Sequence, residues 1–186
     1  MRSLYLPPWR LDLTVAGGLP RLVPAARLAR LVTHALGEAG APAPASVGLI
    51  LTDDRELAGL NVEHMGHEGP TDVLSFPLLH PAAYPAHAGQ DPEERAASVA
   101  AAAPAFGLPP GARPHLGDVV VSVERAVAQA EEGRGGQSGT VQWSAADELR
   151  LLVVHGTLHL CGWDHARAEE GEEMRALERR ILDANR

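Results

Sequence analysis

The run His155-Gly156-Thr157-Leu158-His159-Leu160-Cys161-Gly162-Trp163-Asp164-His165 decides how the rest of the sequence is interpreted. Residues four apart share one face of a helix, so His155 and His159 can direct both imidazoles to one point. Gly162 can reverse the chain at the helix end, because glycine adopts left-handed backbone angles without steric cost. That turn can bring His165 back as a third nitrogen ligand. Three neutral imidazoles with an open fourth position are the usual arrangement of a catalytic zinc, so the run predicts a site for one zinc ion.

The same ligand spacing occurs in a class of zinc peptidases whose signature is H-E-x-x-H-x-x-G-x-x-H. In those enzymes, the glutamate after the first histidine takes the proton from the attacking water. This chain has Gly156 at that position. The ligands of the signature are therefore present without its general base, and a peptidase is the less favoured interpretation.

Three other segments favour a different chemistry: Leu60-Asn61 followed by Gly-Pro-Thr-Asp-Val-Leu-Ser-Phe-Pro at 69–77, Leu-Gly-Asp-Val-Val-Val-Ser at 116–122, and the histidine run itself. In this order they resemble the YbeY family of bacterial endoribonucleases, over most of residues 10–183 apart from one insertion. The resemblance implies a zinc-dependent, single-strand-specific endoribonuclease that acts in ribosomal RNA maturation, at the 3′ end of 16S rRNA, and in ribosome quality control. It also implies single-stranded ribosomal RNA and small-subunit assembly components as partners.

The composition is that of a cytoplasmic protein with one domain. A chain of 186 residues, 45% hydrophobic and 22% charged, is long enough to bury a real core. The N-terminal apolar stretch is too short for a signal peptide, and no run is long enough to span a membrane. Cys161 is the only cysteine, which excludes an internal disulfide, and a small buried thiol is favoured over a fourth metal ligand. The net charge of −8 argues against broad attraction to nucleic acid, so no DNA partner is expected and any RNA site must be local.

Alternating and apolar runs predict strands at 11–15, 46–51, 72–76 and 118–122. Helical spacing and capping residues predict helices at about 20–39, 53–64, 123–132, 144–160 and 167–184. The unbroken apolar centre of 118–122 predicts a strand that is buried on both faces. Strands interleaved with helices indicate a single α+β (α/β-like) domain over residues 1–186, with a mixed sheet of about four strands, about five helices and the metal helix at its centre.

Residues 80–113 are unusual, because they hold six prolines around an alanine-rich middle. A loop of this length inside a compact domain is usually either disordered or functional. Asp91-Pro92-Glu93-Glu94 can open a short helix, since it supplies a cap, a proline for the first turn and acids near the helix dipole. A tolerated flexible insertion is favoured over an RNA-binding or partner-binding element.

No catalytic acid or base is assigned, but four weak candidates stand out: Asp164, Asp72, Ser75 and His67. Asp164 can orient an imidazole or accept a proton, and the alternative is a turn aspartate that bonds its own backbone. Asp72 and Ser75 belong to the segment that the resemblance places near the metal. The alternatives are hydrogen bonding at a strand end and the ordinary alternation of polar and apolar residues along a strand. Glu148, two helical turns before His155, is a weaker candidate and is expected to be a solvated carboxylate.

One position departs from the family pattern. After Asn61 the family usually carries the pair Tyr-Arg, and its arginine is suited to contact phosphate. This chain has His64-Met65 at the corresponding positions. Methionine carries no charge and cannot form the bidentate contact that phosphate recognition uses. Either His67 or Arg55 takes that role, or cleavage is weak and the protein is a ribosome-assembly factor with a structural zinc. The open three-histidine site argues against the second function, because structural zinc is usually closed by four protein ligands.

Overall fold

The structure, a computed structural model, describes residues 1–66, 69, 71–101, 109, 112–133 and 143–186. Within these residues one sheet contains five strands: β1 (Arg2–Leu6), β2 (Trp9–Val15), β3 (Ala45–Thr52), β4 (Val73–Pro77) and β5 (His115–Ser122). Their order across the sheet is β1-β2-β3-β5-β4. β2, β3 and β5 are parallel, whereas the edge strands β1 and β4 are antiparallel to their neighbours. The mixed sheet confirms the predicted fold class.

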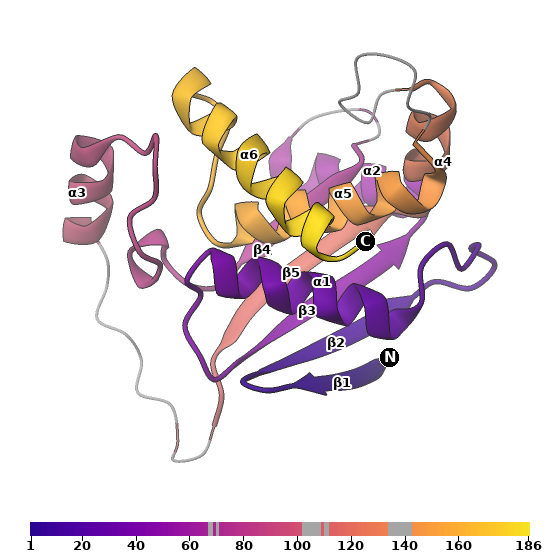
Figure 1. Ribbon diagram of the computed structural model, residues 1–186, viewed down its shortest axis with the longest axis horizontal. Coiled ribbons are helices and arrows are strands. Elements are labelled where there is room, and N and C mark those ends of the chain that lie inside the picture. Colours follow the sequence, from indigo (N-terminus) through magenta and orange to yellow (C-terminus); the bar gives the residue numbers. More distant parts are fainter. Residues whose placement is uncertain (67–68, 70, 102–108, 110–111, 134–142) are drawn as a thin grey trace.

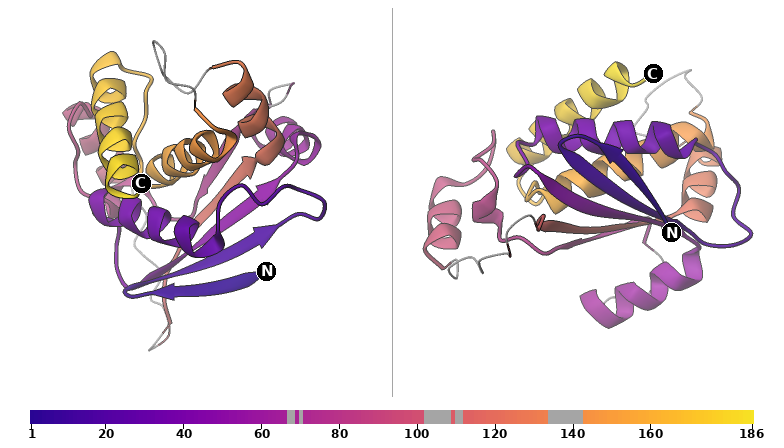
Figure 2. Two further views of the ribbon diagram at one scale, coloured as in Figure 1. Left: turned by 45° about the vertical axis from the view of Figure 1, so that its right-hand side comes forward. Right: turned by 90° about the horizontal axis from the view of Figure 1, so that it is seen from below.

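The described helices are α1 (Ala25–Glu38), α2 (Asp54–Leu60), α3 (Pro92–Ala101), α4 (Val123–Glu131), α5 (Ala145–Leu160) and α6 (Ala168–Ala184). A π-helical turn, η1 (Asn61–Met65), continues α2, and a 3₁₀ turn, η2 (Pro81–Ala83), follows β4. α1, α5 and α6 cover one face of the sheet and α2 lies on the other (Figures 1 and 2). None of these helices is long and apolar enough to cross a membrane.

The larger apolar core lies between the sheet and the layer of α1, α5 and α6. A smaller cluster under α2, on the opposite face, contains Leu57, Leu74 and Val120. The adjacent residues Val119 and Val120 of β5 point to opposite faces and are both buried. This arrangement confirms that β5 is a strand covered on both sides.

Two elements differ from their predictions. β1 was not predicted, because only Leu4 and Leu6 of this edge strand are half-buried and its alternation is therefore weak. α1 begins at Ala25 rather than near residue 20, with Pro24 at its N-cap, since prolines within the predicted start cannot donate helical hydrogen bonds. The short helix expected after Asp91 is α3, and the Asp91 carboxylate accepts the N–H groups of Glu93 and Glu94.

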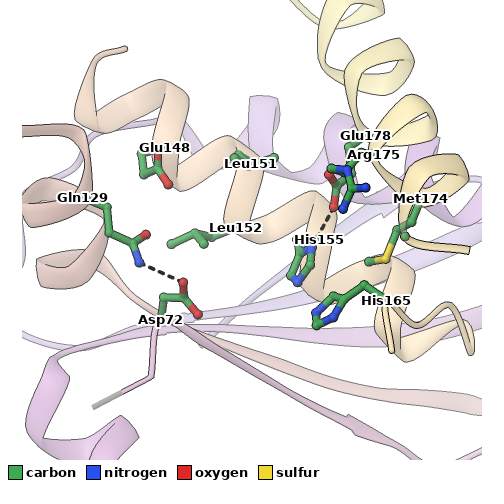
Figure 3. A pocket seen from close by; sticks show the side chains of 11 residues that line it. Asp72, Gln129, Glu148, Leu151, Leu152, His155, His165, Met174, Arg175 and Glu178 are labelled. Carbon is green, nitrogen blue, oxygen red and sulfur yellow. Dashed lines mark hydrogen bonds and ion pairs between the residues drawn. The ribbon is translucent and has the colours of Figure 1, made fainter. Parts of the chain in front are cut away.

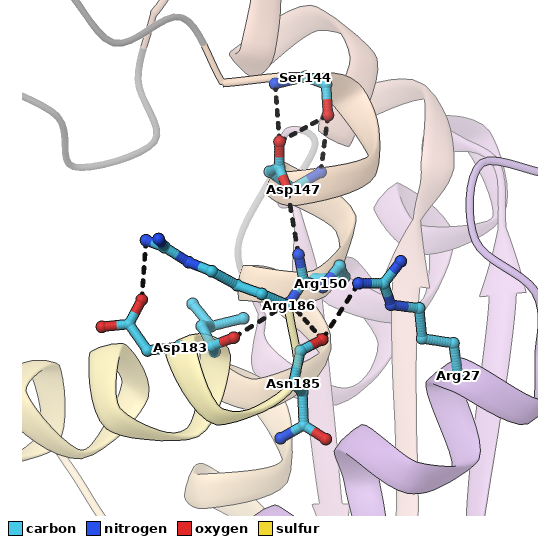
Figure 4. A network of polar contacts seen from close by, with 8 residues as sticks. Arg27, Ser144, Asp147, Arg150, Asp183, Asn185 and Arg186 are labelled. Carbon is cyan, nitrogen blue, oxygen red and sulfur yellow. Dashed lines mark hydrogen bonds and ion pairs between the residues drawn. The ribbon is translucent and has the colours of Figure 1, made fainter.

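α5, which carries the first two histidines, is held at the centre of the helical layer. It begins with a capping box, in which Ser144 and Asp147 each accept the other's backbone N–H. The buried Arg150 guanidinium donates to the carbonyl oxygens of Leu182 and Asn185, at 3.1 and 3.0 Å (Figure 4). Carbonyls at a helix C-terminus lack partners within the helix, so Arg150 satisfies them and ties α5 to the end of α6.

Candidate metal centre

His155, His159 and His165 converge, and each offers a ring nitrogen that lies within 4.8 Å of the other two. The Nε2 atoms of His155 and His159 are 3.1 Å apart. Two nitrogens bound to one tetrahedral zinc at about 2.0–2.1 Å would be about 3.3 Å apart, so this pair has the spacing of two ligands of one ion. In the part of the chain that the structure describes, no other group of acidic, cysteine and histidine side chains has such a spacing.

The turn after α5 explains how His165 joins the other two histidines. Gly162 has a left-handed φ of 88°. Its N–H donates to the His159 carbonyl at 3.0 Å, and the Trp163 N–H donates to the Leu158 carbonyl at 3.1 Å. These two bonds form a Schellman motif, which ends the helix and reverses the chain as predicted for Gly162.

Glu178 of α6 holds the His155 ring, a role that was not predicted. Its Oε1 lies 2.7 Å from His155 Nδ1 (Figure 3), and its side chain is buried. A carboxylate at Nδ1 favours the proton on that nitrogen and leaves the Nε2 lone pair free to bind a metal. Glu178 is 23 residues from His155 and on a different helix, so no local spacing marks it.

The electrostatics of the cluster suit a metal site. Burial, and then the neighbouring imidazoles of His155 and His165, lower the pKa of His159 to about 4. His159 is therefore neutral at neutral pH, which is the form of imidazole that binds a metal. A set of three imidazole nitrogen donors at these distances fits a divalent metal such as zinc.

A pocket of about 350 Å³ lies beside His155 and His165. One end is polar and contains Asp72 of the chain before β4 and Glu148 of α5, while the other end holds Arg175 and Glu178 of α6 (Figure 3). Among the described residues, Arg175 is the only arginine in the lining. Its guanidinium makes no hydrogen bond or ion pair with any residue that the structure describes, so its donors are available to a ligand.

Two of the predicted catalytic candidates bond to neighbouring elements. Asp72 lines the pocket, but its carboxylate accepts from the Gln129 side chain and from the Val73 N–H, both at 2.9 Å. The Ser75 hydroxyl donates to the Gly156 carbonyl at 2.8 Å. These contacts join β4 and the residue before it to α4 and α5.

The remaining candidates lie in different surroundings. Asp164 is exposed and accepts the N–H of His165 at 2.7 Å, which matches the turn-aspartate alternative. Glu148 is only 3% exposed, so the prediction of a solvated carboxylate is wrong, because α4 packs against α5 and helps to bury this part of it. His67 lies outside the described residues. Arg55 and Met65 belong to α2 and η1, and neither lines the pocket.

Gly156 faces the sheet, which was not expected from the peptidase signature. A Cβ at this position would lie 2.6 Å from Val119 Cγ1 and 2.7 Å from Val73 Cγ2. Both distances are well below van der Waals contact, so glycine is what allows α5 to lie this close to β4 and β5. A glutamate here would be directed into the sheet and away from the histidines.

The chain is similar to known proteins in its sequence and in its fold. Residues 22–186 match the family model described as Endoribonuclease YbeY. A protein of that name from Salinispora tropica is 42% identical over 149 residues, which cover 80% of each chain. Another from Roseiflexus castenholzii is 34% identical over 174 residues, covering 93% of this chain and 91% of the relative. The solution structure of a Thermotoga maritima protein shares the fold, with a TM-score of 0.52 and 21% identity over 94% of this chain and 88% of that one.

Proposed function

Because the chain belongs to the YbeY family of endoribonucleases, we propose that it cleaves single-stranded RNA at a zinc site formed by His155, His159 and His165. The observation that carries this proposal is the convergence of the three imidazoles, two of which, His155 and His165, line a pocket. A single zinc ion held by three protein nitrogens keeps a position open for substrate or water, and it supplies Lewis acidity there. This open site supports a catalytic role over a structural one.

The protein side chains around the site have separate tasks in this proposal. Glu178 fixes the tautomer and orientation of His155 through the contact to Nδ1. Arg175 contacts the phosphate beside the cleaved bond, since a guanidinium offers donors in a planar fork that matches phosphate oxygens. The pocket also contains the carboxylates of Asp72, Glu148 and Glu178, which repel phosphate, and Arg175 adds to the positive charge that a bound zinc would supply. Arg175 thus provides the charge that Met65 lacks.

The proposed substrate is single-stranded ribosomal RNA, including the 3′ end of 16S rRNA, in the cytoplasm. Family membership supports this assignment. The net charge of −8 supports a dependence on the ribosome, because the protein as a whole does not attract phosphate. Small-subunit assembly components would then bring the RNA to the site, and cleavage in ribosome quality control would use the same chemistry.

A ribosome-assembly factor without cleavage is the second candidate function. It is favoured by Met65, which is 43% exposed and carries no charge where the family arginine is expected. A peptidase is disfavoured, because the position that would carry its general base is Gly156, which packs against Val119 and Val73.

Cleavage of a labelled single-stranded RNA and of the same RNA in a duplex tests the proposal. Zinc-loaded protein should cut the single strand and leave the duplex intact, whereas chelator-treated protein and His159→Ala should be inactive. Casein serves as the peptidase control and should not be degraded. If the zinc-loaded protein binds ribosomal particles but cuts no RNA, the assembly-factor function replaces the nuclease.

A further inference from the structure

Residues 80–91, here called the strap, cross the loop 161–167 that carries His165. The strap follows β4 and leads into α3, at the side of the molecule where α5 ends (Figure 1). Tyr84 anchors it in the apolar core, where the side chain is 3% exposed and burial raises its pKa. Pro85 fits against Gly40, since a Cβ on Gly40 would lie 2.6 Å from Pro85 Cγ. The strap is therefore fixed to the body of the domain before it reaches the loop.

His87 is the main contact between the strap and the loop. Its side chain is 8% exposed, and its ring stacks on Trp163 with centroids 4.0 Å apart and an interplanar angle of 14°. Its Nε2 lies 3.2 Å from the Gly162 carbonyl oxygen and 3.5 Å from Glu170 Oε1. The same Glu170 oxygen accepts the Asp164 N–H at 3.0 Å. The buried side chain of His87 thus joins the strap to the loop after α5 and to the first turn of α6.

Two further contacts extend this interface along the strap. A Cβ on Gly89 would lie 2.5 Å from the Cα and 2.6 Å from the N of Glu170, so the strap backbone touches the first turn of α6 directly. Asp91 forms an ion pair with Arg167 at 2.9 Å. The strap therefore contacts the loop before and after His165.

We propose that the strap positions His165 for metal binding and that His87 is its positioning residue. This inference rests on the metal site of the proposed function. His165 is the exposed member of the three histidines, so the loop backbone sets the place of its ring more than side-chain packing does. A loop that is already ordered loses less conformational entropy when the metal binds, which raises the affinity of the site. The described part of the insertion thereby acquires a role at the metal centre.

Zinc affinity, measured by competition with a chromogenic chelator, tests the role of His87. His87→Ala should weaken zinc binding by about tenfold or more, as loss of a group that orients a ligand does, and it should speed zinc release. His87→Phe, which keeps an aromatic ring against Trp163 but loses the polar contacts, should fall between His87→Ala and the wild type. His80→Ala is the matched control, because His80 lies in the same strap but is exposed, and among the described residues its side chain bonds only the Ala82 N–H. It should bind zinc as the wild type does.

A purely structural role predicts a different pattern. His87→Ala would then melt at a lower temperature without zinc but bind zinc normally in the folded state, and that result would overturn the proposal. Equal losses in His87→Ala and His80→Ala would overturn it as well. If His87→Ala does not fold, Gly89→Ala gives the test, because it moves the strap off α6 while His87 is kept. Failure of both variants to fold would show that the strap supports the domain rather than the ligand. Wild-type protein that binds no zinc would instead contradict the metal site itself.

Discussion

Glu178 and His155 show how a single distant side chain completes a local motif. The carboxylate fixes the proton on Nδ1 and so decides that Nε2 faces the other histidines. We predict that Glu178→Ala weakens zinc binding by about 10–100-fold, and that Glu178→Gln, which keeps the size and one acceptor, loses less. Chelator competition measures both effects. Glu173→Ala, an exposed acid on the same helix, is the control, and equal affinities of Glu178→Ala and wild type would show that the carboxylate does not act on the metal site.

Arg175 lies beside His165 as well as in the pocket lining. A Cβ on Gly171 would be 3.3 Å from both Arg175 Nη1 and His165 Cβ, so the guanidinium and the third ligand flank the same point. We predict that Arg175→Ala slows single-turnover RNA cleavage by about tenfold or more, because an exposed donor contributes less than the 10²–10³ of a buried one. Zinc content should not change.

RNA affinity measured at several salt concentrations distinguishes a specific contact between Arg175 and a phosphate from non-specific electrostatic attraction. For a contact to one phosphate, the slope of log affinity against log salt should fall by about 0.7 in Arg175→Ala. Arg175→Lys should restore the slope but only part of the rate, because lysine lacks the planar fork. Arg179→Ala removes an exposed arginine of α6 that is absent from the pocket lining. If Arg179→Ala and Arg175→Ala behave alike, Arg175 is not a specific phosphate contact.

The part of the site that could be predicted from the sequence is the part whose residues are close in the chain. His155 and His159 share a helix face and Gly162 reverses the chain, so local geometry alone brings His165 back. Glu178 and Arg175 reach the site only because α6 packs beside α5, and no local spacing in the sequence specifies that packing. The same reason explains the error at Glu148, whose burial depends on a neighbouring helix.

The contact between α5 and the sheet depends on a single glycine. A methyl group at Gly156 would collide with Val119 and Val73, two side chains of adjacent strands that cannot both move away. We predict that Gly156→Ala lowers the free energy of unfolding by about 1–3 kcal/mol, the usual cost of overpacking a core. Urea unfolding measures this change.

A glycine in open space gives the matched control. Apart from its chain neighbours and the backbone of its own helix, no described atom lies within 4 Å of the Cβ that alanine would add at Gly59 of α2. Gly59→Ala should therefore stabilise the protein by up to about 1 kcal/mol, through the better helix propensity of alanine. If Gly156→Ala is as stable as the wild type, α5 does not require a glycine to lie close to β4 and β5.

Gly156→Glu should gain no activity on casein, because the new carboxylate cannot face the histidines.

Helices and central strands were predictable because their periodicity is strong, whereas the edge strand β1 and the start of α1 were not. β1 is an edge strand with only two half-buried leucines, so its pattern is close to that of a loop. The order of strands was also not predictable, since β5 enters between β3 and β4 through contacts far apart in the chain. The role proposed for the strap, residues 80–91, rests on contacts of His87 and Tyr84 with distant parts of the chain, which no local pattern specifies.

For the whole molecule, a bound metal should act as a stabiliser of the folded state. The unfolded chain does not hold His155, His159 and His165 together, so zinc binds it more weakly and shifts the equilibrium towards the native protein. At a free zinc concentration about 100 times the dissociation constant, the gain is about 2.7 kcal/mol. We predict a higher melting temperature with zinc for the wild type and no shift for His155→Ala/His159→Ala. A zinc-dependent shift that persists in the double variant would place the metal elsewhere.

Single-turnover cleavage of one labelled single-stranded RNA, measured while zinc is titrated into metal-free protein, tests the central claim most directly. The rate should rise in proportion to added zinc and level off at about one equivalent per chain, as expected for one catalytic ion. His159→Ala should show no rise at any zinc concentration. A cleavage rate that is the same with and without zinc, or one that is retained in His159→Ala, would contradict a nuclease centred on the three histidines.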